Sequence, residues 1–169
     1  AALGNLGNVY REQGEARRAS EYYEQYLAIA RETGNRREEG DALGNLGLVY
    51  ADLGEVQRAI GYYEKYLAIA REIGDRRGES NALGNLGIAY KDLGNVRLAI
   101  KYHEQTLVID QEIGNRRGIG KTLGNLGSAY WQLGDVQRAL RYYEQQLAIT
   151  CKIGDRRGEG MAPVSYTHL

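Results

Sequence analysis

Several residue types are scarce in this 169-residue sequence, and each scarcity removes a class of protein. A single cysteine, Cys151, excludes an internal disulfide, which fits a reducing compartment, and we expect a cytoplasmic location. Lys and Arg total 22 and Asp and Glu also total 22, so no net charge attracts nucleic acid or an anionic membrane. No apolar run approaches the ~20 residues that span a bilayer.

Proline is also scarce, with one residue, and Val and Thr are few, whereas Ala, Leu, Glu, Arg and Gln are abundant. This balance favours helix over strand. The sequence Leu-Gly-Asn-Leu-Gly occurs at 3–7, 43–47, 83–87 and 123–127, a fixed period that indicates a repeat architecture. We therefore expect one array over residues 1–162, made of a partial unit 1–34, complete units 35–74, 75–114 and 115–154, and the start of another at 155–162.

Each unit contains two glycine-bounded segments, 35–53 and 55–73 in the second unit, that place apolar side chains on one side of a helix. Leu46 and Tyr50 lie on the apolar side of the first segment, whereas Asn45 lies on the opposite side. Two such helices joined by a glycine turn form an αα-hairpin that cannot bury its apolar surface alone. Stacking hairpins buries that surface, so we predict an all-α, right-handed superhelical solenoid.

The residue after the glycine that closes each unit is always Asn or Asp. A side-chain oxygen there can accept a hydrogen bond from a free backbone N–H at the start of a helix. We therefore predict that the first helix of each unit is capped by one of these residues, namely Asn35, Asp75, Asn115 and Asp155.

The repeated residues resemble those of the tetratricopeptide repeat. In the second unit the matching residues are Leu46, Gly47, Tyr50, Gly54, Ala59, Tyr62, Tyr63 and Leu67. Leu43 stands at the usual Trp position, and a longer link through Gly74 replaces the usual closing Pro. This 40-residue, Asn-Leu-Gly-rich form is similar to the repeats of Pins-type mitotic adaptors and, more loosely, of kinesin light chains. The resemblance implies that the first helix of each unit lines a concave face and that this face binds an extended peptide of a partner protein.

Two ladders of polar residues lie on the exposed side of the first helices. An Asn side chain offers a donor and acceptors, so it can pair with a peptide unit of any sequence. Guanidinium groups suit carboxylates, so an Arg ladder would favour an acidic partner. The Asn ladder is Asn5, Asn45, Asn85 and Asn125, and the Arg ladder is Arg37, Arg77, Arg117 and Arg157.

Glycines and variable residues complete the predicted groove. Gly44 and its copies Gly4, Gly84 and Gly124 cost roughly 1 kcal/mol each within a helix relative to Ala. Because nothing in the repeat itself requires them on the exposed face, we interpret them as sites where a ligand backbone approaches closely. Among the variable positions, Leu48 and Ile88 would form a central apolar patch. The single tryptophan, Trp131, is a candidate hot spot for binding or a cover for the edge of the array.

Alternatives accompany this interpretation. The Asn ladder would be structural if it bonded to neighbouring repeats, and the Arg ladder if it were solvated or ion-paired between helices. The whole array would then be an assembly module of a larger signalling regulator. RNA binding is disfavoured because no basic stripe runs along the array.

The sequence indicates no catalytic site, so we expect that the protein is not an enzyme and binds no cofactor or metal. A repeat produces ladders rather than a converging set of distinct residues. Two isolated histidines and one cysteine give no zinc-binding spacing. His103 occupies a position that is Tyr in the other units, so we interpret it as a polar substitute within the helix packing.

The two ends differ from the rest of the sequence. The chain begins with Ala in the middle of a repeat, and residues 163–169 match no unit. We therefore expect a bacterial or metagenomic fragment with a tail that is not native. Uncapped terminal hairpins would expose apolar surface and favour self-association.

Overall fold

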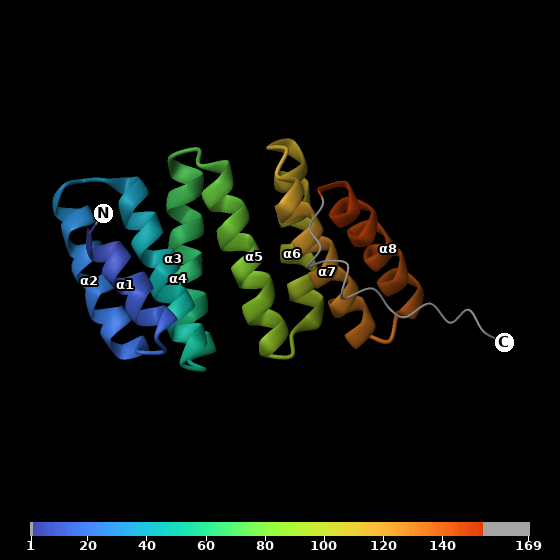
Figure 1. Cartoon of the computed structure of the whole chain (residues 1–169), viewed down its shortest axis with the longest axis horizontal. Helices are drawn as coiled ribbons and strands as arrows, with labels where there is room; N and C mark the ends of the chain where they lie inside the picture. The colour runs from blue at the N-terminus through green and yellow to red at the C-terminus, as the bar shows by residue number, and fades with distance from the viewer. Residues whose placement is uncertain (1, 154–169) are drawn as a thin grey trace.

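The computed structural model describes residues 2–153, and all secondary structure in that range is α-helical (Figure 1). The helices pair into hairpins as the glycine-bounded segments predicted. The predicted unit boundaries at 154 and beyond, the tail, Asp155 and Arg157 lie outside the described residues. The helices are α1 (Ala2–Glu12), α2 (Ala16–Glu32), α3 (Arg36–Asp52), α4 (Val56–Glu72), α5 (Arg76–Asp92), α6 (Val96–Glu112), α7 (Arg116–Gln132) and α8 (Val136–Ile153).

Each described turn between helices contains a glycine in the left-handed backbone region. At the α3–α4 turn, Gly54 has a φ of 76°, which only glycine adopts without a steric penalty. The N–H of Gly54 donates to the carbonyl of Ala51 at 3.0 Å, and the N–H of Glu55 donates to the carbonyl of Tyr50 at 2.8 Å. These bonds satisfy carbonyls that the end of the helix leaves free, so the glycine both ends α3 and reverses the chain.

The predicted N-caps are confirmed for α3, α5 and α7. The side chains of Asn35, Asp75 and Asn115 each accept a hydrogen bond from the backbone N–H three residues later. These bonds satisfy a donor that the first helical turn leaves free. The starts of α3, α5 and α7 are therefore fixed by the local sequence.

The core between the two helices of a hairpin is formed by leucines and aromatic rings. Leu46 of α3 is fully buried, as are its copies Leu86 and Leu126. Gly47 lies directly on the ring of Tyr63, and a Cβ at that position would overlap the ring. The repeated glycine of the Leu-Gly pair therefore lets α3 and α4 approach closely.

Ion pairs connect consecutive hairpins on the surface. Glu39 of α3 accepts from Arg31 of α2 at 2.9 Å and from Arg36 at 2.5 Å, and Arg36 also pairs with Glu72 at the end of α4. The next unit repeats the arrangement, with Arg71 donating to Glu79 at 2.8 Å. Arg76 pairs with Glu79 and Glu112 as Arg36 pairs with Glu39 and Glu72, so the first arginines of these two Arg-Arg pairs belong to the scaffold.

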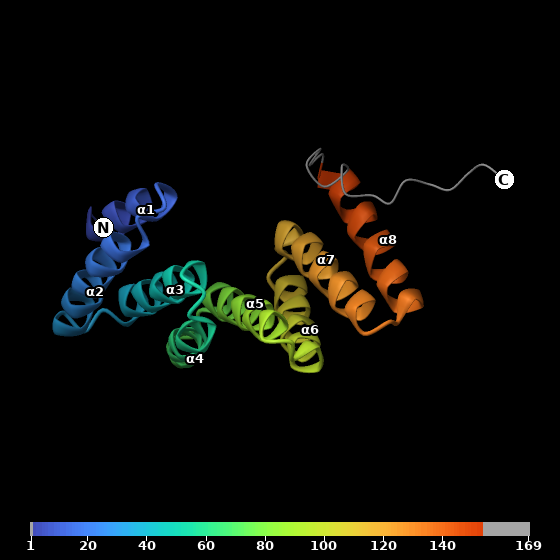
Figure 2. The same cartoon turned by 90° about the horizontal axis from the view of Figure 1, so that it is seen from below.

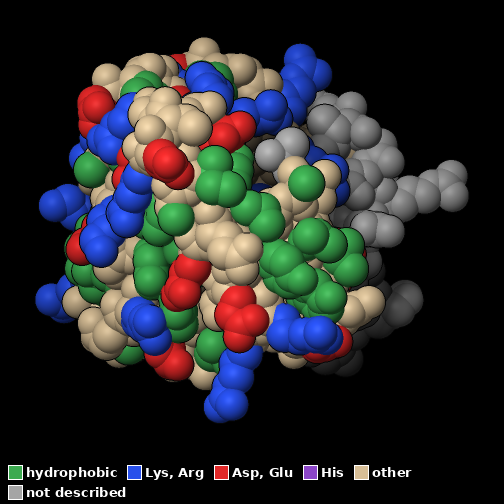
Figure 3. Space-filling view, turned by 90° about the vertical axis from the view of Figure 1, so that its left-hand side faces the viewer, with side chains coloured by type: hydrophobic (Ala, Val, Ile, Leu, Met, Phe, Trp, Pro, Cys, Tyr) green, Lys and Arg blue, Asp and Glu red, His purple; other side chains and the backbone are tan. Residues whose placement is uncertain are grey.

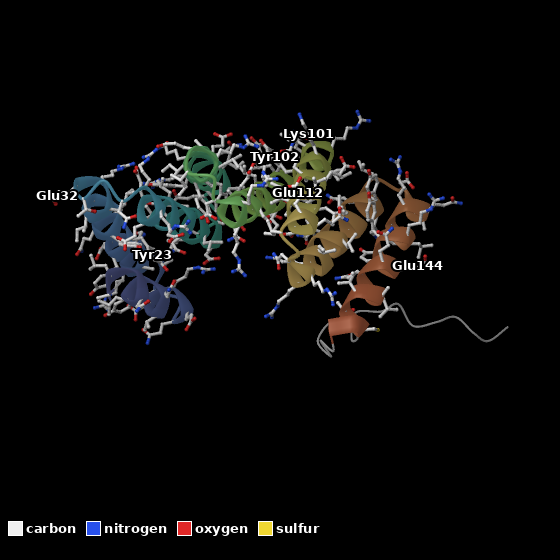
Figure 4. All side chains as sticks on the ribbon, turned by 90° about the horizontal axis from the view of Figure 1, so that it is seen from above. Tyr23, Glu32, Lys101, Tyr102, Glu112 and Glu144 are labelled. Carbon is white, nitrogen blue, oxygen red and sulfur yellow. The ribbon has the colours of Figure 1, made fainter. Side chains whose placement is uncertain are left out.

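The hairpins stack into a curved solenoid in which each helix packs against the ones before and after it. Figure 2 shows α3, α5 and α7 along the inner side of the arc and α4 and α6 along its outer side. Charged side chains such as Lys101 and Glu144 lie on the outer helices α6 and α8 (Figure 4). None of the described helices combines the length and hydropathy needed to cross a membrane.

Apolar side chains are exposed at the α1 end of the array. Leu6 and Val9 are 42% and 48% exposed, whereas their copies Leu46 and Val49 are fully buried by the preceding hairpin. Figure 3 views this end and shows hydrophobic side chains gathered on it. The predicted exposure of a terminal hairpin is confirmed here.

Candidate binding groove on the inner helices

The inner helices line an open groove of about 520 Å³. Asn5 of α1, Asn45 and Leu48 of α3 and Asn85 of α5 all contribute to its walls. Four of the residues predicted to bind a partner are thus brought together by the curvature of the solenoid. They come from three successive units, so the groove runs along the array.

A smaller cavity of about 70 Å³ continues the groove between the third and fourth units. Ile88 of α5 and Asn125 of α7 line it, together with Asn85. Asn85 and Lys121 line both spaces, which makes the two continuous. The complete Asn ladder therefore faces one connected surface.

The amides of the Asn ladder have no partner within the described part of the chain. Asn5 is exposed and Asn45, Asn85 and Asn125 are half-buried, and none of the four side chains hydrogen-bonds to another residue between 2 and 153. The bond to a neighbouring repeat that would make the ladder structural is not formed there. Each amide keeps its donor and acceptor available to a molecule in the groove.

The arginines and the tryptophan of the predicted site lie elsewhere. Arg37, Arg77, Arg117 and Trp131 line neither the groove nor the smaller cavity. Arg37 is exposed and its Nη1 lies 3.4 Å from a carboxylate oxygen of Asp75 in the next unit, the ion-paired arrangement considered as an alternative. Arg77 and Arg117 are exposed. Trp131 is 62% exposed on α7.

Charges of both signs line the groove itself. Asp41 of α3 lies in its wall toward the α1 end, and Lys121 of α7 lies toward the other. Desolvation in the groove raises the pKa of Asp41, the nearby Asp75 carboxylate adds to the rise, and Arg37 opposes it. The groove floor is thus mixed in charge rather than uniformly basic.

The glycine ladder has a different cause from the one predicted. Gly44 is buried, and a Cβ there would come within 3.0 Å of the Tyr66 ring of α4. A Cβ at Gly124 would overlap the end of the flexible Gln146 side chain, whereas at Gly4 and Gly84 it would make ordinary contacts with Tyr26 and Thr106, at 3.5 and 3.7 Å. The prediction that nothing in the repeat requires these glycines is therefore wrong for Gly44, where the Tyr66 ring of the outer helix occupies the space.

The structure adds three groove residues from the apolar side of the outer helices. Tyr26 and Tyr66 line the groove, and Thr106 lines the smaller cavity. Tyr66 and Thr106 are buried, so they take part in the helix packing as well as in the wall of the groove. What distinguishes this position in the sequence is that its residue type varies between units, whereas core positions repeat. The four copies are Tyr26, Tyr66, Thr106 and Gln146.

The remaining reactive side chains do not form a site. Within residues 2–153 no group of three His, Cys, Asp or Glu side chains could hold a metal ion. His103 is 1% exposed between α5 and α6, where burial lowers the pKa of its imidazole to about 4, with a further contribution from Lys91 and Lys121. Cys151 is an exposed free thiol on α8.

Comparison with known proteins agrees with this architecture. The family model described as Tetratricopeptide repeat matches residues 1–72, 38–111 and 78–152. A search of curated protein sequences found no match. Solved structures with the same fold were found at identities of 25% or below.

Three of these structures illustrate the range. BtubC (BKLC) from P. vanneervenii is 24% identical, with a TM-score of 0.82 over 99% of this chain and 68% of that one. The kinesin light chain-like repeats of Podosopora anserina are 25% identical, with a TM-score of 0.76 over 89% and 74%. A Rap protein complexed with Competence and Sporulation Factor is 18% identical, with a TM-score of 0.86 over 93% and 44%, so the chain spans less than half of that protein.

Proposed function

The chain belongs to the tetratricopeptide repeat family, and we propose that it is a non-catalytic, cytoplasmic scaffold that binds an extended peptide of another protein along its inner helices. The observation that carries the proposal is the Asn ladder. Four amides spaced by one repeat face a continuous groove and have no partner among the described residues. An extended peptide offers N–H and C=O groups at regular intervals, so such a ladder suits its backbone.

Further features support a peptide rather than a small molecule. The groove runs across three inner helices and is open along its length, whereas small-molecule sites enclose most of their ligand. Leu48 and Ile88 add half-buried apolar surface between the amides. A solved Rap protein, 44% of which has this fold, is complexed with Competence and Sporulation Factor.

The preference for an acidic partner is proposed in a narrower form. Because Arg37, Arg77 and Arg117 line neither cavity, they would act only on residues of the peptide that leave the groove near the starts of the inner helices. The mixed charges of Asp41 and Lys121 favour no single sign in the groove itself. We propose no role for nucleic acid or membrane.

A rival function is supported by a separate observation. Leu6 and Val9 are exposed at the α1 end, whereas the preceding hairpin covers their copies Leu46 and Val49, so this end would accept a further hairpin or a second array. That function would use the end of the array and would leave the Asn ladder without a role. Mutation of the Asn ladder therefore distinguishes the two proposals.

The test combines a peptide display library with the double variant Asn45→Ala, Asn85→Ala. We expect peptides selected on the wild type to bind the variant roughly thirtyfold more weakly, since two lost amide contacts are worth about 2 kcal/mol. The melting temperature should stay unchanged, because neither side chain makes a hydrogen bond within the described residues.

The matched control is Gln25→Ala, Gln57→Ala, which removes two exposed amides from the outer helices α2 and α4. It should bind the same peptides as the wild type does. Equal weakening in both double variants, or a drop in stability without any effect on binding in the Asn variant, would exclude the groove as the site.

A further inference from the structure

The cavity of about 70 Å³ lies in the third hairpin at the place that a tyrosine side chain occupies in the second hairpin. In the second hairpin, the Tyr66 ring lies over Gly40 and Gly44 of α3, at 3.2 and 3.0 Å from where their Cβ atoms would be. Its hydroxyl lies 3.2 Å from the position that a Cβ would take on Gly78 of the next unit. The neighbouring Asn81 amide opposes the rise that burial causes in the pKa of Tyr66.

The equivalent outer-helix residue in the third hairpin is Thr106, which leaves that space unfilled. Its methyl group stops 3.7 Å from the Cβ position of Gly84, and its hydroxyl donates back to the carbonyl of Tyr102 at 2.9 Å. The four neighbours of Tyr66 have equivalents one repeat, or 40 residues, further along the chain. These equivalents are Ser80, Gly84, Gly118 and Lys121. All four of these residues line the cavity.

The deep end of the cavity carries a buried carboxylate that the other units lack. Asp110 is 1% exposed and occupies the position of Ala30, Ala70 and Thr150. Its Oδ1 accepts from Ser80 Oγ at 2.7 Å and from Asn115 Nδ2 at 2.9 Å. Its Oδ2 accepts no hydrogen bond within residues 2–153 and lies beside Gly118, on the side where Tyr66 places its hydroxyl in the preceding unit.

We propose that this cavity accepts the side chain of a tyrosine from the bound peptide, an inference that rests on the proposed function of the groove. The ring takes the place beside Gly84 that Thr106 leaves open, with one edge in the groove because Ser80 narrows the deep end. The phenol O–H donates to Asp110 Oδ2 and its oxygen accepts from Lys121. A hydroxyl provides both roles, whereas phenylalanine provides neither and a lysine ammonium would face Lys121 with the same charge.

The cavity can be tested without knowing the peptide. Amide chemical shifts of the 15N-labelled chain would be followed on addition of p-cresol, toluene or n-butylamine, the side-chain analogues of Tyr, Phe and Lys. We expect saturable shifts at Gly84, Thr106 and Gly118 with p-cresol, and binding about tenfold weaker with the other two probes. Tighter binding of n-butylamine would overturn the proposal in favour of a basic side chain.

Two variants at one residue test the location. Thr106→Tyr places in the cavity the residue found in the first two units and should abolish p-cresol binding. Thr106→Val keeps the shape of the wild-type side chain and should bind p-cresol as the wild type does. Unchanged p-cresol shifts in a folded Thr106→Tyr variant would place the probe elsewhere and refute the site, and loss of binding in both variants would refute the role of the open space.

The polar end is tested by Asp110→Asn, which keeps the size of the side chain. The advantage of p-cresol over toluene should fall about tenfold, and an unchanged advantage would refute the role of the carboxylate. Failure of these tests leaves the groove intact, because peptide binding that depends on Asn45 and Asn85 is measured separately. Conversely, p-cresol binding without any peptide binding would retain the cavity and reject the proposed function.

Discussion

The buried imidazole of His103 is the clearest weak point of the array. It replaces the tyrosine found at positions 23, 63 and 143 and is 1% exposed. Neither ring nitrogen has a hydrogen-bond partner among the residues that the structure describes. A buried polar group without a partner costs about 1–3 kcal/mol. Restoring the residue of the other units with His103→Tyr should therefore increase the free energy of unfolding by about that amount at pH 7.

The same substitution should change how stability depends on pH. Burial lowers the pKa of His103 from 6.5 to about 4, so the unfolded chain binds a proton at a pH where the folded chain does not. Stability should be constant above pH 6.5, decrease as the pH falls from 6.5 to 4, and level off below that. A difference of about 2.5 pH units corresponds to roughly 3 kcal/mol.

The carboxylates of the scaffold titrate in a lower range. The pKa of Glu39 is lowered from its model-compound value of 4.5; burial raises it, but hydrogen bonds from Arg31 and Arg36 outweigh that effect. Its contribution to stability is present above 4.5 and is lost as the pH falls below. A loss of stability between pH 6.5 and 4.5 is therefore attributed to the histidine, because the raised pKa of Asp41 makes stability increase as the pH falls.

The assay is urea unfolding followed by circular dichroism between pH 4.5 and 7.5. Wild type should lose stability through this interval, and His103→Tyr should show a nearly flat profile. The reverse substitution, Tyr63→His, is the matched control and should destabilise the second hairpin while adding a pH dependence. If His103→Tyr kept the full slope of the wild type, the imidazole would not be its source and the reasoning would be refuted.

Two further predictions concern packing and association. Gly47→Ala should lower the free energy of unfolding by about 2 kcal/mol or more, because the added Cβ would overlap the Tyr63 ring. Gly61→Ala is the control: its Cβ meets no neighbour, so the free energy of unfolding should rise by about 1 kcal/mol. Equal effects of the two substitutions would contradict the packing argument. If the α1 end self-associates, the double variant Leu6→Lys, Val9→Lys should sediment as a monomer at concentrations where the wild type does not. The control Leu93→Lys changes an exposed leucine elsewhere and should sediment as the wild type does. A wild type that stays monomeric would exclude this association.

The fold was predictable from the sequence because each hairpin carries its own local instructions. Asn35 begins α3, Gly54 ends the hairpin turn, and the spacing of Leu46 and Tyr50 defines the buried side. These signals act over one or two helical turns and do not depend on distant parts of the chain. Repetition in register then makes the same information readable several times.

The groove was only partly predictable. The Asn ladder was identified because helical periodicity places it opposite the core. The same periodicity could not show that Tyr66, although buried, also lines the groove, because that depends on how successive hairpins are arranged. The role of Gly44 was misread for another reason: its neighbour Tyr66 lies on the second helix of the hairpin, which a projection of α3 alone leaves out.

Departures from the repeat concentrate on one face of α6. His103, Thr106 and Asp110 are spaced by three and four residues, so they share that face. The surroundings of Asp110 supply donors for its Oδ1. Ser80 stands where the second unit has Gly40, and Asn115 is an amide that can donate where the Asp75 carboxylate could not.

His103 has no such compensation and stays without a partner. The third hairpin thus places a carboxylate with one bonded oxygen, Oδ1, at the end of an open cavity, and a destabilising imidazole about two turns away on the same face. The third hairpin is therefore where this array departs from a uniform scaffold, and where its selectivity among peptides should be sought first.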